Sequence, residues 1–265
     1  MRQAGDDVPA QVAAVVLDLG AGRIRDIEPI KHGLTNRSWR VHTDGDTLVV
    51  RLSEASAEEL QIDRDSEAAV LQVVARAGIG AQVLRCDPQR GILVTRYLGE
   101  PWTEQDAQLD SNIDRLARLL RHLHTLEAPA TVRRVDLASI ADGYARTLQE
   151  RGTHPELTAT RLRGRAADAR TRLREGSTAC LCHNDVYHLN VIDGDTLRLI
   201  DWEYAGVGER LFDLASVCVY HRYGSSQRER LLGAYASPSA TVNPQRLELA
   251  CWLFDYIREL WMAVR

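Results

Sequence analysis

Hydrophobic and polar residues alternate in short runs over the first third of the chain, from Ile24 to about Arg96. Such alternation is typical of strands that bury one face. The sequence Asp44-Gly45-Asp46 separates two of these runs and is a hairpin signal. One helix is expected among them, from about Ala57 to Ala77, because apolar residues recur there at helical spacing. The expected strands are Ile24 to Ile30, Ser38 to Thr43, Thr47 to Leu52, Gln82 to Arg85 and Gly91 to Arg96.

Beyond residue 98 the pattern changes to long amphipathic helices. In Leu109 to Leu126, leucines and Ile113 recur at intervals of three and four residues along one face. Further helices are expected at Leu137 to Arg151, Pro155 to Arg174, Arg210 to Tyr223, Gln227 to Tyr235 and Pro244 to the end. The pattern predicts an α+β protein with two domains, a small β-rich lobe at residues 1–97 and a larger, mainly helical lobe at residues 98–265.

Composition and charge exclude several classes of protein. The 265 residues are 45% apolar and carry a formal charge of -4, with the arginines spread along the chain, so nucleic acid is not an expected partner. No run approaches the roughly 20 apolar residues that cross a bilayer, and the start lacks the apolar run of a signal peptide. We therefore expect a cytoplasmic protein without a membrane segment. The five cysteines are expected to be reduced, and Cys180, Cys182 and His183 are too crowded on one strand for the usual zinc spacing.

A short β-rich island, from about Cys180 to Tyr204, interrupts the helices and carries the most informative polar residues. His183, Asp185 and Asn190 form H-x-D-x-x-x-x-N, and Asp201 directly follows an apolar strand. Phosphoryl transfer needs a carboxylate near the acceptor hydroxyl and oxygen ligands for Mg²⁺. We expect Asp185 to take the hydroxyl proton, and Asn190 and Asp201 to bind Mg²⁺. His183 is expected to act in the catalytic loop by hydrogen bonding rather than as a base.

With these residues in place, the sequence resembles the aminoglycoside phosphotransferase and choline kinase superfamily. The resemblance rests on H-N-D with Asn190, on I-D-W-E-Y-A-G, on F-D-L-A-S-V and on G-L-T-N-R-S-W-R-V, and it extends loosely over nearly the whole chain. G-L-T-N-R-S-W together with D-W-E-Y-A-G is most similar to the bacterial choline kinase and thiamine kinase branch. The resemblance implies a two-lobed protein-kinase-like fold that uses ATP and Mg²⁺. It also assigns Asp185 as the base and Asn190 and Asp201 as the metal ligands.

The loop between the first two expected strands is the candidate phosphate-binding loop. Its small and hydroxylated residues would let backbone N–H groups face phosphate oxygens. Taken alone, the loop would be read as a simple hairpin connection. The resemblance implies that it covers the phosphates, and the cofactor-binding candidates there are Gly33, Thr35, Asn36 and Ser38.

Arg51 lies on the third expected strand, where protein kinases have a lysine. A guanidinium keeps the positive charge and adds a planar fork that suits phosphate. Its expected partner is Glu67 on the helix, with Glu59 as a second candidate; the alternative is that Arg51 and Glu67 are solvated surface residues. Lys31, the only lysine of the sequence, is interpreted as a surface residue.

The last expected helix offers a face for the acceptor. Trp252, Asp255, Tyr256 and Glu259 are spaced so that aromatic and acidic groups lie on one side, where they could hold a cation. The alternative is that this stripe packs in the core. The substrate-binding candidates are Trp202, Glu203, Tyr204, Trp252 and Tyr256, with Trp261 as a further member of the cage, whereas Asp213 is expected to be a buried structural acid.

The function predicted from these residues is that of a kinase that phosphorylates a hydroxyl of a small, cationic molecule similar to choline or thiamine. An aminoglycoside or amino-sugar kinase is an alternative that would need more acids around the acceptor. A nucleotide-binding pseudokinase acting through a partner is another, although it need not keep Asp185, Asn190 and Asp201. A metal-dependent hydrolase using His183, Asp185 and His188 would leave the first lobe without a purpose.

Overall fold

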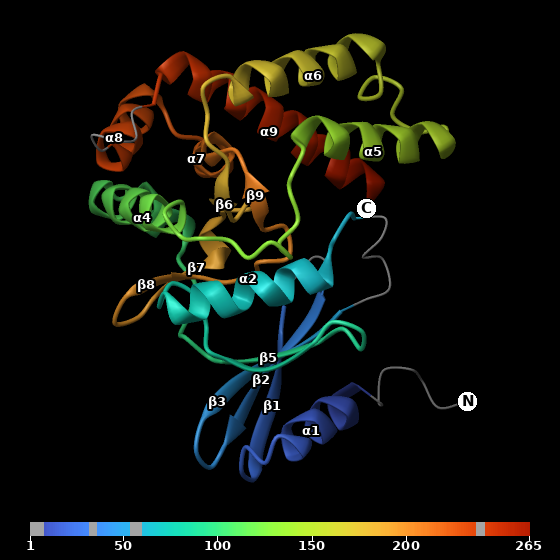
Figure 1. Ribbon diagram of the computed structural model, residues 1–265. Coiled ribbons are helices and arrows are strands. Elements are labelled where there is room, and N and C mark those ends of the chain that lie inside the picture. Colours follow the sequence, from blue (N-terminus) through green and yellow to red (C-terminus); the bar gives the residue numbers. More distant parts are fainter. Residues whose placement is uncertain (1–7, 32–35, 54–59, 237–241) are drawn as a thin grey trace.

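Five antiparallel strands form a sheet at one end of the molecule, in the order β1-β2-β3-β5-β4 (Figure 1). The computed structural model describes residues 8–31, 36–53, 60–236 and 242–265. The strands are β1 (Ile24–Ile30), β2 (Asn36–Thr43), β3 (Thr47–Ser53), β4 (Val83–Asp87) and β5 (Ile92–Arg96). The strands expected from the alternating pattern are therefore present, with ends that differ by one or two residues.

One face of this sheet is covered by helix α1 (Val8–Asp18), for which the sequence analysis predicted no element. Trp39, Val41 and Val50 alternate along β2 and β3 and lie on the buried face, as strand geometry requires. Val12 and Val16, one helical turn apart, pack against them. The sheet and α1 thus form a small core of their own.

Helix α2 (Arg64–Arg76) begins later than the expected helix at Ala57, which lies outside the described residues. Asp63 caps it, because its side chain accepts a hydrogen bond of 2.9 Å from the backbone N–H of Ser66. The buried residues Val70 and Val74 belong to the core of the larger lobe and not to that of α1. In Figure 1, α2 lies between the sheet and the larger lobe.

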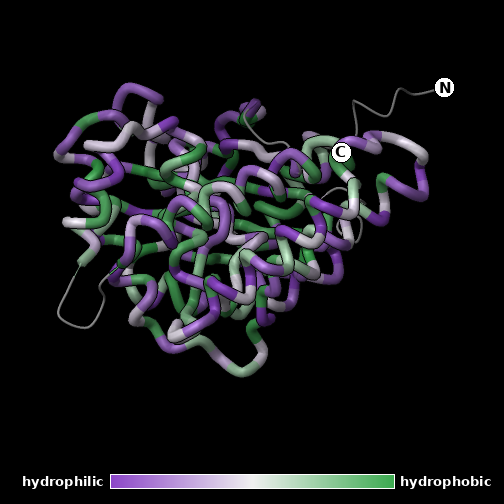
Figure 2. Tube along the Cα trace, turned by 90° about the horizontal axis from the view of Figure 1, so that it is seen from above, coloured by the Kyte–Doolittle hydropathy of each residue, from purple (hydrophilic) through white to green (hydrophobic). Residues whose placement is uncertain are grey.

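The larger lobe is mainly helical. Figure 2 shows hydrophobic and hydrophilic stretches alternating along the chain, as expected of helices that bury one face. The helix predicted from Pro155 begins only at Thr160, after a series of turns. The helices are α3 (Glu104–Gln108), α4 (Asp110–Leu123), α5 (Leu137–Glu150), α6 (Thr160–Arg174), α7 (Arg210–Tyr220), α8 (Ser225–Tyr235) and α9 (Pro244–Val264).

The predicted β-rich island lies between α6 and α7 and forms two short antiparallel pairs. Strand β6 (Cys180–Cys182) pairs with β9 (Gly206–Gly208), and β7 (Val191–Asp193) pairs with β8 (Leu197–Leu199). A 3₁₀ turn at His188–Asn190 leads into β7. The sheet lobe and the helical lobe confirm the predicted fold class, whereas the boundary between residues 97 and 98 stays a prediction. Among the described helices, none is long and apolar enough to span a membrane.

Candidate active site

The β7–β8 hairpin brings Asn190 and Asp201 together at its open end. The Asp-Gly turn reverses the chain so that Val191 pairs with Leu199. One step further, the N–H of Ile200 donates to the carbonyl oxygen of Asn190 at 3.0 Å. Asp201 therefore directly follows the residue that bonds to Asn190, and both residues line the same cleft.

Asp185 lies in the loop before this hairpin, and its carboxylate is held from two sides. The hydroxyl of Tyr220 donates to Oδ1 at 2.6 Å, and the amide nitrogen of Asn190 lies 3.4 Å from Oδ2. The same amide donates to the backbone carbonyl of Asp185 at 3.0 Å, so the side-chain oxygen of Asn190 is the group left for another ligand. Burial raises the pKa of Asp185, as it does that of Asp201, where the neighbouring Glu203 adds to the effect.

His183 is fully buried and both of its ring nitrogens are used within the loop. Nε2 lies 2.9 Å from the carbonyl oxygen of Ile200 and must donate, while Nδ1 accepts from the N–H of Asp185 at 3.3 Å. These two bonds assign Nε2 as the donor of the ring and Nδ1 as its acceptor. His183 therefore orients Asp185 and braces the residue before Asp201, as the sequence analysis expected.

Helix α7 supports the same loop from behind. Asp213 accepts hydrogen bonds from the backbone N–H groups of His183 and Asn184, at 2.9 and 2.6 Å, and is completely buried. Ser216 accepts from the N–H of Val186 at 3.2 Å. The expected role of Asp213 as a buried structural acid is confirmed. With Tyr220, these residues form one polar face of an otherwise apolar helix.

Two residues of the site have left-handed backbone conformations that are uncommon outside glycine: Asn184, with φ of 68°, and Asp201, with φ of 63°. The side chain of Asn184 donates to the carbonyl oxygen of Tyr204 at 2.9 Å, which helps to hold its turn. Strain of this kind persists only where surrounding contacts fix it, and it is concentrated at functional sites.

Arg51 faces Asp201 from the other side of the site and is held by a buried ion pair. Both oxygens of Glu67 contact its guanidinium at 2.7 Å, and Nη1 lies 3.5 Å from Asp201. Burial lowers the pKa of Arg51, but the adjacent Glu67 outweighs this effect and the pKa lies above its usual value. The Nε of Arg51 is buried without a hydrogen-bond partner among the described residues.

Arg64, which the sequence analysis did not single out, extends this network to the segment after Asp201. Its guanidinium contacts Glu67 at 2.8 Å and Glu203 at 3.0 Å. It also donates to Asn36, whose amide in turn donates to Glu203 at 2.7 Å. The network joins β2, β3 and α2 to the larger lobe.

The phosphate-loop candidates are only partly within the described residues. Gly33 and Thr35 lie outside them, as does Glu59, the second candidate partner of Arg51. Asn36 belongs to the Arg64 network, and Ser38 pairs with Arg51 in the β2–β3 ladder. Ser38 is thus a direct strand neighbour of Arg51, and the phosphate-binding role of this segment stays a prediction.

A cleft of about 880 Å³ opens beside Asp185 and Asp201. An aromatic wall of Tyr204, Tyr220, Phe254 and Trp261 lines the side next to Asp185. The indole N–H of Trp261 donates to the hydroxyl of Tyr204 at 2.8 Å, which ties α9 to the segment after Asp201. This wall combines apolar rings with a carboxylate at one end.

Two of the expected substrate residues are on the wrong face of α9. Trp252 and Tyr256 stack on each other, and Arg165 of α6 lies 3.9 Å above the Trp252 ring. The Tyr256 hydroxyl donates to the carbonyl oxygen of Leu157 at 2.8 Å. Both rings therefore pack against the preceding helices, and Phe254 and Trp261 face the cleft in their place.

Two more substrate candidates, Trp202 and Glu203, make buried contacts that support the fold. Trp202 is 1% exposed, its ring lies 4.5 Å from that of His183, and its N–H donates to Leu199 at 3.1 Å. It packs beneath the catalytic loop and does not reach the cleft. Glu203 lines the cleft but its side chain, 2% exposed, is paired with Arg64. Of these three neighbours, Glu203 and Tyr204 line the cleft and Trp202 does not.

Tyr220 is the contact to Asp185 that the sequence analysis missed. The signal that would have found it is the spacing of Asp213, Ser216 and Tyr220, which are polar residues at i, i+3 and i+7 of a buried helix. A polar stripe of this kind inside a core needs partners, and here the partners are the catalytic loop.

Comparison with known proteins extends the likeness to nearly the whole chain. A family model described as the phosphotransferase enzyme family matches residues 26–249. The chain is 25% identical over 229 residues to protein LicA of Haemophilus influenzae, a match that covers 82% of this chain and 65% of that protein's length.

Solved structures agree on the fold. Choline kinase LicA from Streptococcus pneumoniae superposes with a TM-score of 0.82 at 20% identity, over 96% of this chain and 90% of that one. A LicA structure in complex with AMP gives a TM-score of 0.81 at 22% identity, over 96% of this chain and 89% of that one. A choline/ethanolamine kinase family protein from Mesorhizobium loti gives 0.77 at 26% identity, over 99% and 86% of the two chains.

Proposed function

The chain belongs to the phosphotransferase enzyme family and is a small-molecule kinase, and we propose that it transfers the γ-phosphate of ATP to a hydroxyl of a small cation of the choline type. The observation that carries the proposal is the hairpin that sets Asn190 and Asp201 beside Asp185, with Arg51 opposite. Phosphoryl transfer depends almost entirely on positioning and on electrostatic stabilisation. These four side chains supply both.

The residues at the hairpin end suit Mg²⁺. The ion takes oxygen ligands, and the carboxylate of Asp201 and the side-chain oxygen of Asn190 are of that kind. Bound there, Mg²⁺ would neutralise charge on the phosphate oxygens of ATP. The hydrogen bonds from the Asn190 amide to Asp185 keep its oxygen directed away from that residue and available to the ion.

Arg51 takes the role of the lysine that protein kinases use toward the phosphates. Its planar fork matches phosphate oxygens, and Glu67 fixes the guanidinium so that little side-chain entropy is lost on binding. The buried Nε, which has no hydrogen-bond partner among the residues that the structure describes, is a donor that a phosphate oxygen would satisfy. ATP as donor is further supported by the AMP complex of the similar LicA.

Asp185 is proposed to orient the acceptor hydroxyl and to take its proton. The hydrogen bond from Tyr220 fixes the carboxylate at Oδ1, which leaves Oδ2 toward the cleft side shared with Asn190. The proton of the attacking hydroxyl would pass to this carboxylate as the new oxygen–phosphorus bond forms. Such a group typically contributes ~10²- to 10⁴-fold in rate.

The aromatic wall next to Asp185 favours a single small cation as the acceptor. Tyr204, Tyr220, Phe254 and Trp261 line the cleft, and aromatic faces attract quaternary ammonium groups. The names of the similar proteins, choline kinase and choline/ethanolamine kinase, are consistent with this chemistry.

The acids of the cleft argue against an aminoglycoside. Among the described lining residues the acids are Glu104, Asp185, Asp201 and Glu203. Two of these have proposed roles in transfer, and Glu203 is paired with Arg64. Glu104 alone remains, whereas an aminoglycoside brings several ammonium groups that each need a partner.

An ATP-consumption screen with Mg²⁺ across choline, ethanolamine, thiamine, amino sugars and aminoglycosides tests the proposal. We expect the fastest turnover with choline or thiamine. Asp185→Asn should lower kcat at least ~10²-fold while ATP binding persists. Asp195→Asn, which changes an exposed acid of the nearby turn, is the matched control and should leave kcat unchanged. Absence of turnover with every acceptor would contradict the proposal and favour a pseudokinase.

A further inference from the structure

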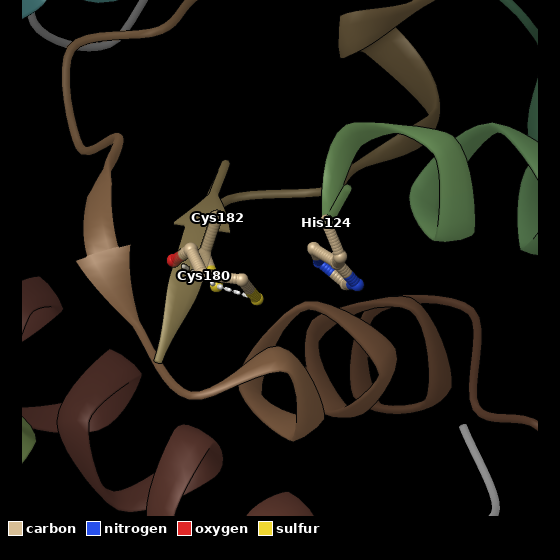
Figure 3. A group of neighbouring side chains, drawn as sticks. All are labelled: His124, Cys180 and Cys182. Carbon is tan, nitrogen blue, oxygen red and sulfur yellow. Dashed lines mark hydrogen bonds between the residues drawn. The ribbon is translucent and has the colours of Figure 1, made fainter. Parts of the chain in front are cut away.

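Three potential metal ligands meet behind the catalytic loop, outside the machinery described above. Figure 3 shows His124, at the end of α4, beside Cys180 and Cys182 of β6. The two cysteines are two positions apart on a strand, so their side chains lie on the same side. One nitrogen of His124 and both sulfurs lie within 4.8 Å of one another.

The spacing of these atoms matches what a tetrahedral ion requires. The two Sγ atoms are 3.8 Å apart. Two thiolates that each lie about 2.3 Å from a tetrahedral zinc ion are about 3.8 Å apart as well. An ion could therefore enter between the sulfurs without moving the strand, and only the imidazole has to approach.

Both ring nitrogens of His124 have an oxygen partner. One of its ring nitrogens, Nε2, lies 3.0 Å from Oδ2 of the buried Asp213, and Nδ1 lies 2.7 Å from the hydroxyl of Tyr235. Whichever nitrogen bound an ion, the other would keep an oxygen partner. Such outer partners fix the tautomer and the orientation of ligating histidines.

We propose that His124, Cys180 and Cys182 form a binding site for a thiophilic divalent ion of the Zn²⁺ class, with water in the fourth position. Binding replaces the two thiol protons, which pass to solvent, by the ion. Cys180 is half-buried, whereas Cys182 is fully buried. The sequence analysis disfavoured zinc because Cys180, Cys182 and His183 are crowded on one strand; in the structure the histidine beside the two sulfurs is His124, a residue far away in the sequence.

The site also connects to the reaction centre, because Asp213 holds both His124 and the backbone of the catalytic loop.

The test is a titration of the reduced, full-length protein with Co²⁺ and Zn²⁺ in excess Mg²⁺, which occupies the oxygen sites. We expect one Co²⁺ per chain with thiolate-to-cobalt charge-transfer absorption, and its displacement by Zn²⁺. Loss of an outer partner alone weakens metal binding ~10- to 100-fold, so Cys180→Ser should weaken Zn²⁺ binding at least ~10²-fold in competition with a chromophoric chelator.

Two other cysteines provide matched controls. Cys86→Ser and Cys251→Ser change an exposed and a buried thiol outside the cluster and should bind Zn²⁺ as the wild type does. Absence of charge-transfer absorption in the wild type would overturn the proposal, and this result does not depend on any variant. Unchanged Zn²⁺ affinity in Cys180→Ser, or loss of binding in either control, would overturn it equally.

Discussion

The buried ion pair of Glu67 offers the sharpest test of how β3 of the sheet lobe is held against α2. We consider Glu67→Gln, which keeps the shape of the side chain and removes its charge. Glu67 is 2% exposed and contacts Arg51 at 2.7 Å and Arg64 at 2.8 Å, so the substitution leaves two buried guanidinium groups short of a carboxylate.

The size of the expected loss of unfolding free energy depends on the ion pairs that Arg51 and Arg64 keep. Breaking a buried ion pair from one side costs roughly 3–5 kcal/mol. Arg51 keeps Asp201 at 3.5 Å, and Arg64 keeps Glu203 at 3.0 Å. Because each arginine still has one carboxylate, we expect the lower end, about 3 kcal/mol of lost unfolding free energy.

The assay is urea unfolding, monitored by tryptophan fluorescence and by far-UV circular dichroism. If the two signals change at the same urea concentrations, unfolding is a single transition. With a slope of about 3 kcal/mol/M, the midpoint should fall by about 1 M. The matched control is Glu248→Gln, because Glu248 pairs with Arg228 at 2.5 Å but its side chain is 61% exposed. That variant should lose less than about 1 kcal/mol.

The contribution of the Glu67 charge to the unfolding free energy should depend on pH in a definite direction. Burial raises the pKa of Glu67, but Arg51 and Arg64 outweigh it and the pKa lies below the ordinary 4.5. A lowered pKa means that the charge stabilises the fold above pH 4.5 and that this contribution is lost as the pH falls through the folded-state pKa. The difference between wild type and Glu67→Gln should therefore be constant near neutral pH and shrink in acid. If Glu67→Gln and Glu248→Gln differed by less than about 1 kcal/mol at pH 7, the account of this network would be wrong.

Two further predictions concern the aromatic wall and the cysteine thiols. Trp261→Phe removes the hydrogen bond to the Tyr204 hydroxyl and should raise KM for the acceptor up to ~10-fold, while KM for ATP stays unchanged. Trp252→Phe is the control and should change neither KM. Equal effects of the two substitutions would refute the assignment of the faces of α9. Iodoacetamide near neutral pH should label Cys180 before the more exposed Cys86. The reason is that the hydrogen bond from Cys182 lowers the pKa of Cys180 to about 7, whereas partial burial of the sulfur raises the pKa of Cys86. Peptide mass spectrometry that found Cys86 labelled first would contradict this prediction.

The hairpin of the site could be predicted from the sequence because its determinants are local. Asp185, Asn190 and Asp201 lie within one short segment, and the Asp-Gly turn between apolar runs defines which residues pair. Once that register is given, Asn190 and Asp201 have to be neighbours. Short-range geometry of this kind needs no knowledge of the remaining chain.

The orientation of α9 could not be predicted because it depends on distant partners. Helical spacing shows that Trp252 and Tyr256 share a face and that Phe254 and Trp261 share another, and both faces carry aromatic rings. The choice between them is made by α5 and α6, and the Tyr256 hydroxyl bonds to Leu157, about a hundred residues earlier. Periodicity identifies a face but not the neighbour that covers it.

The first residues of the helices could not be predicted from the sequence either, and the reason is physical. An apolar repeat shows where a helix packs, whereas its first residue depends on a side chain that satisfies free N–H groups. Asp63 does this for α2 and determines where that helix starts. For the cluster of His124 with Cys180 and Cys182 there was no local signal, because its members come from two separate elements.

The Arg51–Glu67 ion pair also has a mechanical consequence, because its partners are anchored in different cores. Arg51 lies on β3, whose Val50 packs with α1, whereas Glu67 lies on α2, whose Val70 packs with the larger lobe. A displacement of β3 relative to α2 would therefore lengthen the pair between Arg51 and Glu67. Because Asp201 belongs to the larger lobe, the same displacement would also move Arg51 away from Asp201.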